Sequence, residues 1–185
     1  GCGNNYIYFN CFDQTVPDPE SLSIKLSEPH FGIGGDGIIL ISPSDKADAQ
    51  MRIFNADGSE GKMCGNGIRC VGKYLYDNGM TDGRTTITID TLSGVKTLEL
   101  TVKDGKMQSA RVDMGAAILA PREIPVDMDG ENVISAPIVV DEKVYHMTCV
   151  SMGNPHCVIF QKEDVDDLDL TRIGPKFEHH PLFPE

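Results

Sequence analysis

The 185-residue chain lacks any apolar run near the roughly 20 residues that a membrane-spanning helix requires. Residues 1–5 are polar and no basic flank precedes an apolar stretch, so we expect no signal peptide. Positive charge is scarce, because 16 Lys and Arg stand against 28 Asp and Glu, a formal net charge of −12. Nucleic acid and anionic membranes would be repelled by this charge, and we expect neither as a partner.

The cysteines also lack the patterns that would give them structural roles. They form no C-x2-C pair, no dense framework of the kind found in small secreted proteins, and no Cys/His cluster with metal-ligand spacing. We therefore expect free thiols, no bound metal and the reducing cytoplasm. Most free cysteines are small core residues, so a catalytic role has to be argued for one in particular. The six are Cys2, Cys11, Cys64, Cys70, Cys149 and Cys157.

What is present is the composition of an ordinary globular protein, with 40% hydrophobic and 24% charged residues. Strand patterns are frequent and helical patterns are few. The predicted strands are 6–12, 38–41, 51–55, 85–91, 95–102, 109–113, 138–140, 143–151 and 157–161, and the predicted helical segments are 21–27, 66–78 and 167–174. We expect an α+β fold with twisted, mainly antiparallel sheets and a boundary near Gly115, giving domains 1–115 and 116–185.

Cys64 stands where a loop ends and a predicted helix begins. The helix is indicated by apolar residues at Ile68, Val71 and Leu75. A thiolate at this position faces the positive end of the helix dipole, which favours the charged form. The first-turn N–H groups of Gly65, Asn66 and Gly67 have no partner within the helix and can bind a carboxylate. The pattern suits chemistry beside a carboxylate, although a buried core cysteine would leave the same pattern.

A second polar segment, residues 153–157, reads Gly-Asn-Pro-His-Cys after a strand pattern. His156 can act as a base or set the protonation of a nearby thiol, and it can equally be a hydrogen-bonded structural histidine. Asn154 is held extended by the proline after it, so its amide can bind a ligand or form a turn. Asn4 lies in the loop before the first strand, and it too can bind a ligand or form a turn.

The glycine-rich loop at residues 32–37 resembles a phosphate-binding loop only superficially. It lacks the Lys-Ser/Thr ending of a P-loop, and a strand rather than a helix follows it. We therefore exclude phosphate binding there.

Taken together, these segments resemble the diaminopimelate epimerase family. The Asn-Ala-Asp-Gly-Ser-Glu segment and the Cys-Gly-Asn-Gly-x-Arg-Cys segment are jointly specific, and the matching pieces follow the family's order along nearly the whole chain. They are residues 3–4, 31–37, 52–60, 63–70, 152–160 and 178–185.

The resemblance implies two pseudo-symmetric domains, each wrapping a sheet around a central helix, with the second one incomplete here. It also implies an isomerase that interconverts LL- and meso-diaminopimelate without any cofactor, in the biosynthesis of lysine and peptidoglycan precursors. One thiolate removes the α-proton and a thiol on the opposite face returns one. A small-molecule substrate is then the main partner, and relatives are often homodimers.

The resemblance also assigns roles by position. Cys64 matches the family's first catalytic cysteine, the proton donor, and His156 matches the histidine that tunes it. The substrate-binding positions match Asn4, Asn55, Gly65, Asn66 and Asn154. Of these, Gly65 and Asn66 match the pair whose amides hold the α-carboxylate.

The chain departs from the family pattern at three places. Position 37 is Gly where some members have a substrate-binding Gln, and Asn5 stands where Asp is usual. More seriously, the second Cys-Gly-x-Gly segment is missing, and Cys70 cannot replace it because six helical residues turn it about 120° away from Cys64. We expect the 185 residues alone to be inactive and the second thiol to lie beyond Glu185.

Other functions remain open from the sequence. A proline racemase-like enzyme of the same superfamily would typically carry His where Asn66 stands. A non-catalytic module that keeps the fold would have a Cys64 that alkylates like an ordinary thiol. A Cys/His metal protein would contain zinc, but the ligand spacing is wrong for it.

Overall fold

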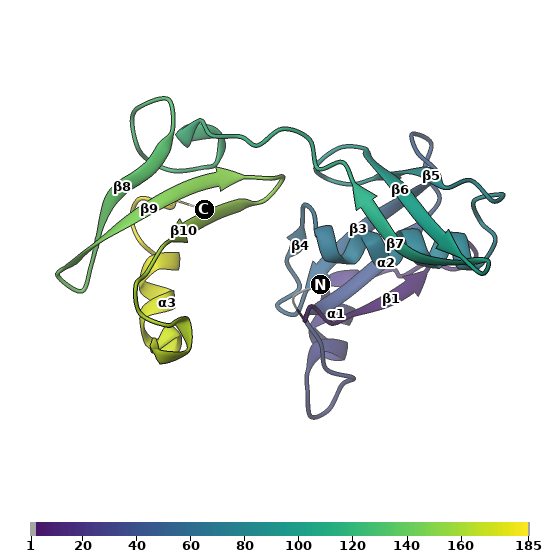
Figure 1. The fold of residues 1–185 in the computed structure, drawn as a ribbon. Helices are drawn as coiled ribbons and strands as arrows, with labels where there is room; N and C mark the ends of the chain where they lie inside the picture. The colour runs from purple at the N-terminus through teal and green to yellow at the C-terminus, as the bar shows by residue number, and fades with distance from the viewer. Residues whose placement is uncertain (1–2, 185) are drawn as a thin grey trace. The chain divides into compact units, whose positions relative to one another are not determined.

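The computed structural model describes residues 3–184 and divides the chain into two compact units that join at Met114 and Gly115 (Figure 1). Cys2 lies outside the described residues. We call residues up to Met114 the first unit and those from Gly115 the second unit, and each is described by itself.

The first unit is built on one curled, mostly antiparallel sheet with strand order β1-β2-β3-β5-β6-β7, to which β4 adds beside β3. Only β1–β2 and β3–β5 pair in parallel among the described strands. The strands are β1 (Tyr6–Asn10), β2 (Gly37–Ser42), β3 (Ala49–Asn55), β4 (Glu60–Gly61), β5 (Thr86–Asp90), β6 (Lys96–Lys103) and β7 (Lys106–Val112). The predicted α+β class with mainly antiparallel pairing is confirmed.

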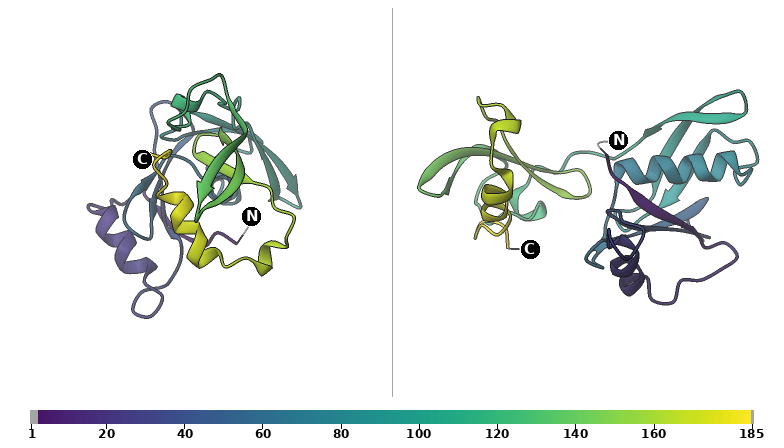
Figure 2. Two further views of the ribbon diagram at one scale, coloured as in Figure 1. Left: turned by 90° about the vertical axis from the view of Figure 1, so that its left-hand side faces the viewer. Right: turned by 90° about the horizontal axis from the view of Figure 1, so that it is seen from below.

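Two helices cover opposite faces of this sheet. Alternate residues of β2 point to opposite sides, so Ile39 joins the core under α2 (Gly65–Asp77) while Ile38 joins the core under α1 (Pro19–Ser27). Figures 1 and 2 show the sheet curling around α2. Burial on both sides explains why β2 reads as a continuous apolar run rather than an alternating one.

Helix α2, Gly65–Asp77, begins and ends one residue earlier than the predicted 66–78. Its buried stripe contains Ile68 and Val71, each fully buried, and Leu75, which is 1% exposed. Gly72 lets the helix approach the sheet closely, because a Cβ added there would lie 2.8 Å from Leu98 Cδ2. At the other end Asn78 N–H donates to the Tyr74 carbonyl, which closes the last turn. The apolar stripe therefore fixes the helix against the sheet.

The second unit holds a three-stranded antiparallel sheet of order β10-β9-β8 and the helix α3. Its elements are β8 (Val133–Val140), β9 (Lys143–Ser151), β10 (Pro155–Ile159), α3 (Leu170–Glu178) and the 3₁₀ turns η1 (Pro121–Glu123) and η2 (Val165–Asp167). The ring of Phe177, on α3, meets Tyr145 of β9 edge-on with 5.0 Å between ring centres. This contact closes the core of the unit.

Three predicted boundaries in the second unit were wrong. The helical turn placed at 167–174 is a full helix that begins after Asp169, whose side chain accepts from Arg172 N–H. The last strand begins at Pro155, two residues early, because proline is tolerated at a strand's first position. Strand β8 begins at Val133, before an irregularity at Ser135, where φ is +52°. Such an irregularity leaves no clean alternation to recognise.

Among the described residues, no helix is both long and apolar enough to cross a membrane.

Candidate active site

Cys64 is the N-cap of α2. Its backbone is extended, with φ −136° and ψ 108°, and its Sγ accepts a hydrogen bond from Gly67 N–H at 3.3 Å. The expectation that Gly67 offers a free N–H to a ligand was therefore wrong, because the cysteine itself satisfies it. Gly65 and Asn66 occupy the first turn, where no earlier turn can accept their N–H groups. The helix start thus presents a half-buried sulfur beside two backbone donors and the positive end of the helix dipole.

Asn4 lies against the same helix start. Asn66 Nδ2 donates to Asn4 Oδ1 at 2.6 Å, so two of the predicted ligand-binding amides touch although 62 positions separate them in the sequence. The structure therefore brings Cys64, Gly65, Asn66 and Asn4 together within the first unit.

Asn55 lies at the same edge of the sheet. The register aligns Tyr6, Gly37 and Asn55 side by side at the ends of β1, β2 and β3. Asn55 Nδ2 donates to Ser59 Oγ at 3.0 Å, and Ser59 Oγ donates to Asp57 Oδ1 at 2.6 Å. The Asn-Ala-Asp-Gly-Ser turn therefore holds the Asn55 amide through its own side chains.

Gly37 has a structural reason to lack a side chain. Its φ is +146°, and a Cβ built there would lie 2.0 Å from the Phe54 carbonyl oxygen and 2.9 Å from Asn55 Cα. No side chain fits without moving the backbone of β3. In this chain, position 37 therefore contributes only backbone next to Asn55.

Sequence reasoning missed Tyr6. Burial first, and then the neighbouring Cys64 and Asp36, raise the pKa of Tyr6 to about 12. Burial first, and then Cys70 and Cys64, also raise the pKa of Tyr8, two residues along the same face of β1. Residues two apart in an extended segment face the same side, so the spacing from Asn4 to Tyr6 was the signal that could have identified Tyr6.

Asn154 and His156 belong to the second unit. Asn154 lies in the turn between β9 and β10, where its carbonyl accepts from Met152 N–H at 3.2 Å. His156 is exposed on β10, opposite Val150. Cys64 lies in the first unit and His156 in the second, and their partnership stays a prediction.

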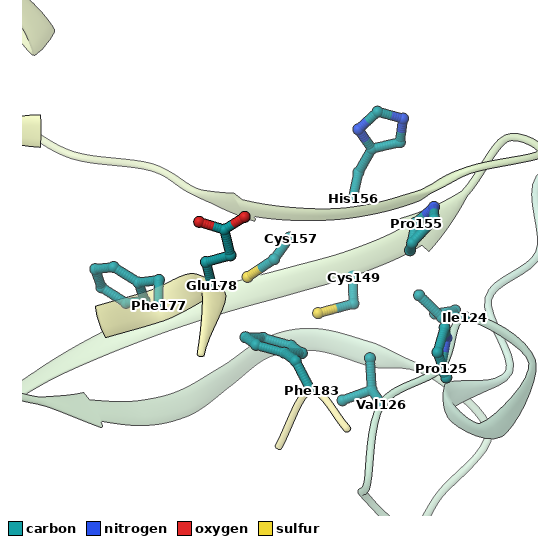
Figure 3. Close-up of a pocket in the computed structure, with 10 residues that line it drawn as sticks. All are labelled: Ile124, Pro125, Val126, Cys149, Pro155, His156, Cys157, Phe177, Glu178 and Phe183. Carbon is teal, nitrogen blue, oxygen red and sulfur yellow. The ribbon is translucent and has the colours of Figure 1, made fainter. Parts of the chain in front are cut away.

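A pocket of about 440 Å³ lies in the second unit, and Figure 3 shows its lining. Cys149 and Cys157 face each other across β9 and β10, with their sulfur atoms inside the pocket. The His156 ring points away from both sulfurs, because successive strand residues face opposite sides. Burial, and then Cys157, raises the pKa of Cys149 to about 12, so this thiol holds its proton.

The described residues include no group of three or more His, Cys, Asp or Glu side chains arranged to hold a metal ion.

Known structures share this fold. A hydroxyproline epimerase from Agrobacterium vitis matches with a TM-score of 0.60 and 19% identity, over 84% of this chain and 40% of that one. A probable proline racemase from Agrobacterium radiobacter K84 matches with a TM-score of 0.60 and 20% identity, over 86% of this chain and 42% of that one. At such low identity these matches show the fold alone.

Sequence comparisons identify the family. A sequence model described as diaminopimelate epimerase matches residues 1–120. The diaminopimelate epimerase of Acetivibrio thermocellus is 56% identical over 185 residues, which cover 100% of this chain and 65% of that protein. The Agathobacter rectalis enzyme of the same name is 53% identical over 192 residues, covering 100% of this chain and 67% of that protein. The chain thus spans about two thirds of the length of these relatives. It belongs to the diaminopimelate epimerase family, as the sequence motifs had indicated.

Proposed function

We propose that the protein interconverts LL- and meso-2,6-diaminopimelate without a cofactor, by moving the α-proton between two thiols. The observation that carries the proposal is the start of α2, where Cys64 caps the helix, Gly65 and Asn66 form its first turn, and the Asn66 side chain contacts Asn4. Relatives that are 56% and 53% identical carry the name diaminopimelate epimerase. This activity belongs to the biosynthesis of lysine and of peptidoglycan precursors.

The chemistry follows from the charge that the reaction creates. Removing a proton from the carbon next to a carboxylate pushes negative charge onto the carboxylate oxygens. Two backbone N–H groups at a helix start, aligned with the helix dipole, stabilise that charge. We assign this role to Gly65 and Asn66, and substrate positioning to Asn4, Asn55 and Asn154.

Inversion needs an acid and a base on opposite faces of the carbon, because a single base returns the proton to the side it left. We assign Cys64 as one of the two, with His156 setting its protonation. Cys149 is a poor candidate for the other, because burial raises its pKa to about 12. Cys70 lies on the helix that Cys64 caps, and six helical residues turn it about 120° away from Cys64. We therefore assign neither of these two cysteines as the second thiol.

The test is exchange of the α-hydrogen. The protein is incubated with LL-diaminopimelate in D₂O, and NMR follows both deuteration at the α-carbon and formation of the meso isomer. We expect both in wild-type protein that includes the second thiol, and neither in its Cys64→Ala variant or in residues 1–185 alone. Undiminished exchange in Cys64→Ala would refute the assignment of Cys64, and exchange with proline instead would favour a proline racemase-like activity.

A second measurement separates the enzyme from a non-catalytic module with the same fold. Iodoacetamide labelling of Cys64 at mildly acidic pH reports how much thiolate is present. We expect rapid labelling that diaminopimelate prevents. Labelling at the rate of an ordinary thiol, with no protection by the ligand, would support the module.

A further inference from the structure

Four polar side chains form one continuous chain of hydrogen bonds at the proposed site. Asn4 Nδ2 donates to Asp36 Oδ2 at 3.3 Å, and Asn66 Nδ2 donates to Asn4 Oδ1 at 2.6 Å. The Arg69 guanidinium then donates to Asn66 Oδ1. The chain links the loop before β2, the segment before β1 and helix α2, so it exists only in the folded protein.

The two ends of the chain impose its direction. An ionised carboxylate only accepts hydrogen bonds and a guanidinium only donates them, whereas an asparagine amide can do either after a 180° flip. If the Asn4 amide flipped, its oxygen would face the Asp36 carboxylate and its NH₂ would face the NH₂ of Asn66. Asp36 and Arg69 together therefore allow one orientation of both amides.

Both ends are also tied to the backbone. Asp36 Oδ2 accepts from Asn5 N–H at 2.9 Å, and Asp36 N–H donates to the Asn5 carbonyl at 2.8 Å. Gly35 allows this approach, since a Cβ there would lie 2.6 Å from the Asn5 oxygen. The glycine-rich loop, which does not fit a phosphate-binding loop, thus holds Asp36 against the segment that carries Asn4.

Arg69 holds the other end at the helix start. Its Nε donates to the Gly65 carbonyl at 3.2 Å while its guanidinium also reaches Asn66. Gly65 and Asn66 are the two residues whose backbone N–H groups we assign to the substrate carboxylate. One side chain therefore contacts both halves of the proposed carboxylate-binding pair.

We propose that Asp36 and Arg69 are positioning residues, which lock the amides of Asn4 and Asn66 so that each keeps one N–H directed to a carboxylate ligand. The inference rests on the proposed function for the identity of that ligand. Neither residue reacts with the substrate. Their effect is on how tightly the ligand binds, through the orientation of two other side chains.

The test uses Asp36→Asn and Arg69→Gln, which remove each fixed end and keep the size similar. The rate at which iodoacetamide labels Cys64 is measured at increasing diaminopimelate concentrations. For each variant, this rate is divided by its own rate without diaminopimelate. We expect the half-protecting concentration to rise about 3- to 10-fold in each variant, as loss of one charged hydrogen bond at a solvent-accessible site predicts. In the double variant, the half-protecting concentration should rise by less than the product of the two single increases. The reason is that losing either end already frees the two amides to flip.

Asp48→Asn and Arg84→Gln supply the matched control. These residues form a direct ion pair at 2.7 Å in the same unit, so the same chemical changes are made away from the four-residue chain. We expect ligand protection of Cys64 to stay at the wild-type value in both. Circular dichroism of each variant verifies that it folds.

A ligand-free measurement keeps the inference separate from the proposed function. The side-chain NH₂ signals of Asn4 and Asn66 are assigned by NMR, and Arg69→Gln should shift the signal of Asn4, which Arg69 does not touch. Unchanged protection in both variants, when the ligand does protect the wild type, would overturn the inference. If diaminopimelate protects nothing, the proposed function fails, and the Asn4 signal then decides: a shift supports the locked chain and no shift refutes it.

Discussion

The hydroxyl group of Tyr6 is a further polar group near Cys64, and it belongs to none of the sequence motifs. With its pKa raised to about 12 by burial, by Cys64 and by Asp36, the phenol stays protonated throughout the range in which thiols titrate. A protonated hydroxyl beside a sulfur donates to the thiolate and favours it. We therefore predict that Tyr6 is a donor to Cys64.

Tyr6→Phe removes only that donor. We predict that iodoacetamide labels Cys64 about 3- to 10-fold more slowly at mildly acidic pH in this variant, the effect expected for losing about 1 kcal/mol of hydrogen bonding. Labelled peptides are quantified by mass spectrometry. Tyr74→Phe is the matched control, since Tyr74 lies ten residues beyond Cys64 on α2, and it should leave the Cys64 rate unchanged. Equal rates in Tyr6→Phe and the wild type would refute the role of Tyr6.

Cys149 provides the opposite case, a thiol kept protonated by its surroundings. Burial raises its pKa to about 12, so its thiolate fraction is small at pH 8 and grows only as the pH approaches 12. We predict that native protein at pH 8 incorporates iodoacetamide at exposed Cys70 at least 10-fold faster than at Cys149, which is 1% exposed. Denatured protein should label both alike. Comparable rates in the native state would show that the pocket in Figure 3 does not protect this thiol.

At the scale of elements, packing and local preference conflict at Gly72. Alanine there should stabilise an isolated helix by about 1 kcal/mol. Its Cβ, however, would lie 2.8 Å from Leu98 Cδ2 and 3.4 Å from Leu100 Cδ2, and both leucines are packed in the core. Because overpacking costs about 1–3 kcal/mol, we predict that Gly72→Ala lowers the free energy of unfolding by up to about 2 kcal/mol.

The same element offers an internal check by denaturant unfolding. In a Leu98→Ala background the clash disappears, so adding Gly72→Ala should become stabilising. A Gly72→Ala change that is destabilising by the same amount in both backgrounds would place the cause elsewhere than in helix–sheet packing.

Elements were predictable from the sequence where one face is buried and the ends are marked. The stripe of Ile68, Val71 and Leu75 located α2, and the residues that flank it located its start at Cys64. Strand β4 was missed because two residues carry no period, and it exists only by pairing with β3. Helix α3 was underestimated because Pro175 lies inside it.

The candidate site was predictable residue by residue but not as an arrangement. Asn4, Asn55 and Cys64 stood out by their chemistry and by family resemblance. The hydrogen bond between Asn4 and Asn66 depends on the pairing of distant segments. The same holds for the bonds from Asp36 and Arg69 at the two ends of the hydrogen-bond chain. Local periodicity tells which face a side chain takes, but not which partner it meets there.

At the scale of the whole molecule, the assigned residues are divided between the two units. Asn4, Asn55 and Cys64 lie in the first, and Asn154 and His156 lie in the second. The segment between them has little regular structure: Ala116 and Ala117 are exposed, and the next residue, Ile118, is fixed to Ser151 of β9 by two backbone hydrogen bonds. The sequence led us to propose a boundary near Gly115, between domains 1–115 and 116–185.

Limited proteolysis tests this boundary. An exposed segment without regular structure is the preferred site of nicking, and elastase cleaves after small residues such as alanine. We predict that brief elastase treatment cuts first after Ala116 or Ala117 and releases two fragments that resist further digestion, as mass spectrometry would identify. Ala117→Pro should suppress the cut after Ala116, because the bond before a proline is a poor substrate. A first cut inside β1–β7 or β8–β10, or digestion with no stable intermediate, would show that the two units do not hold their folds independently.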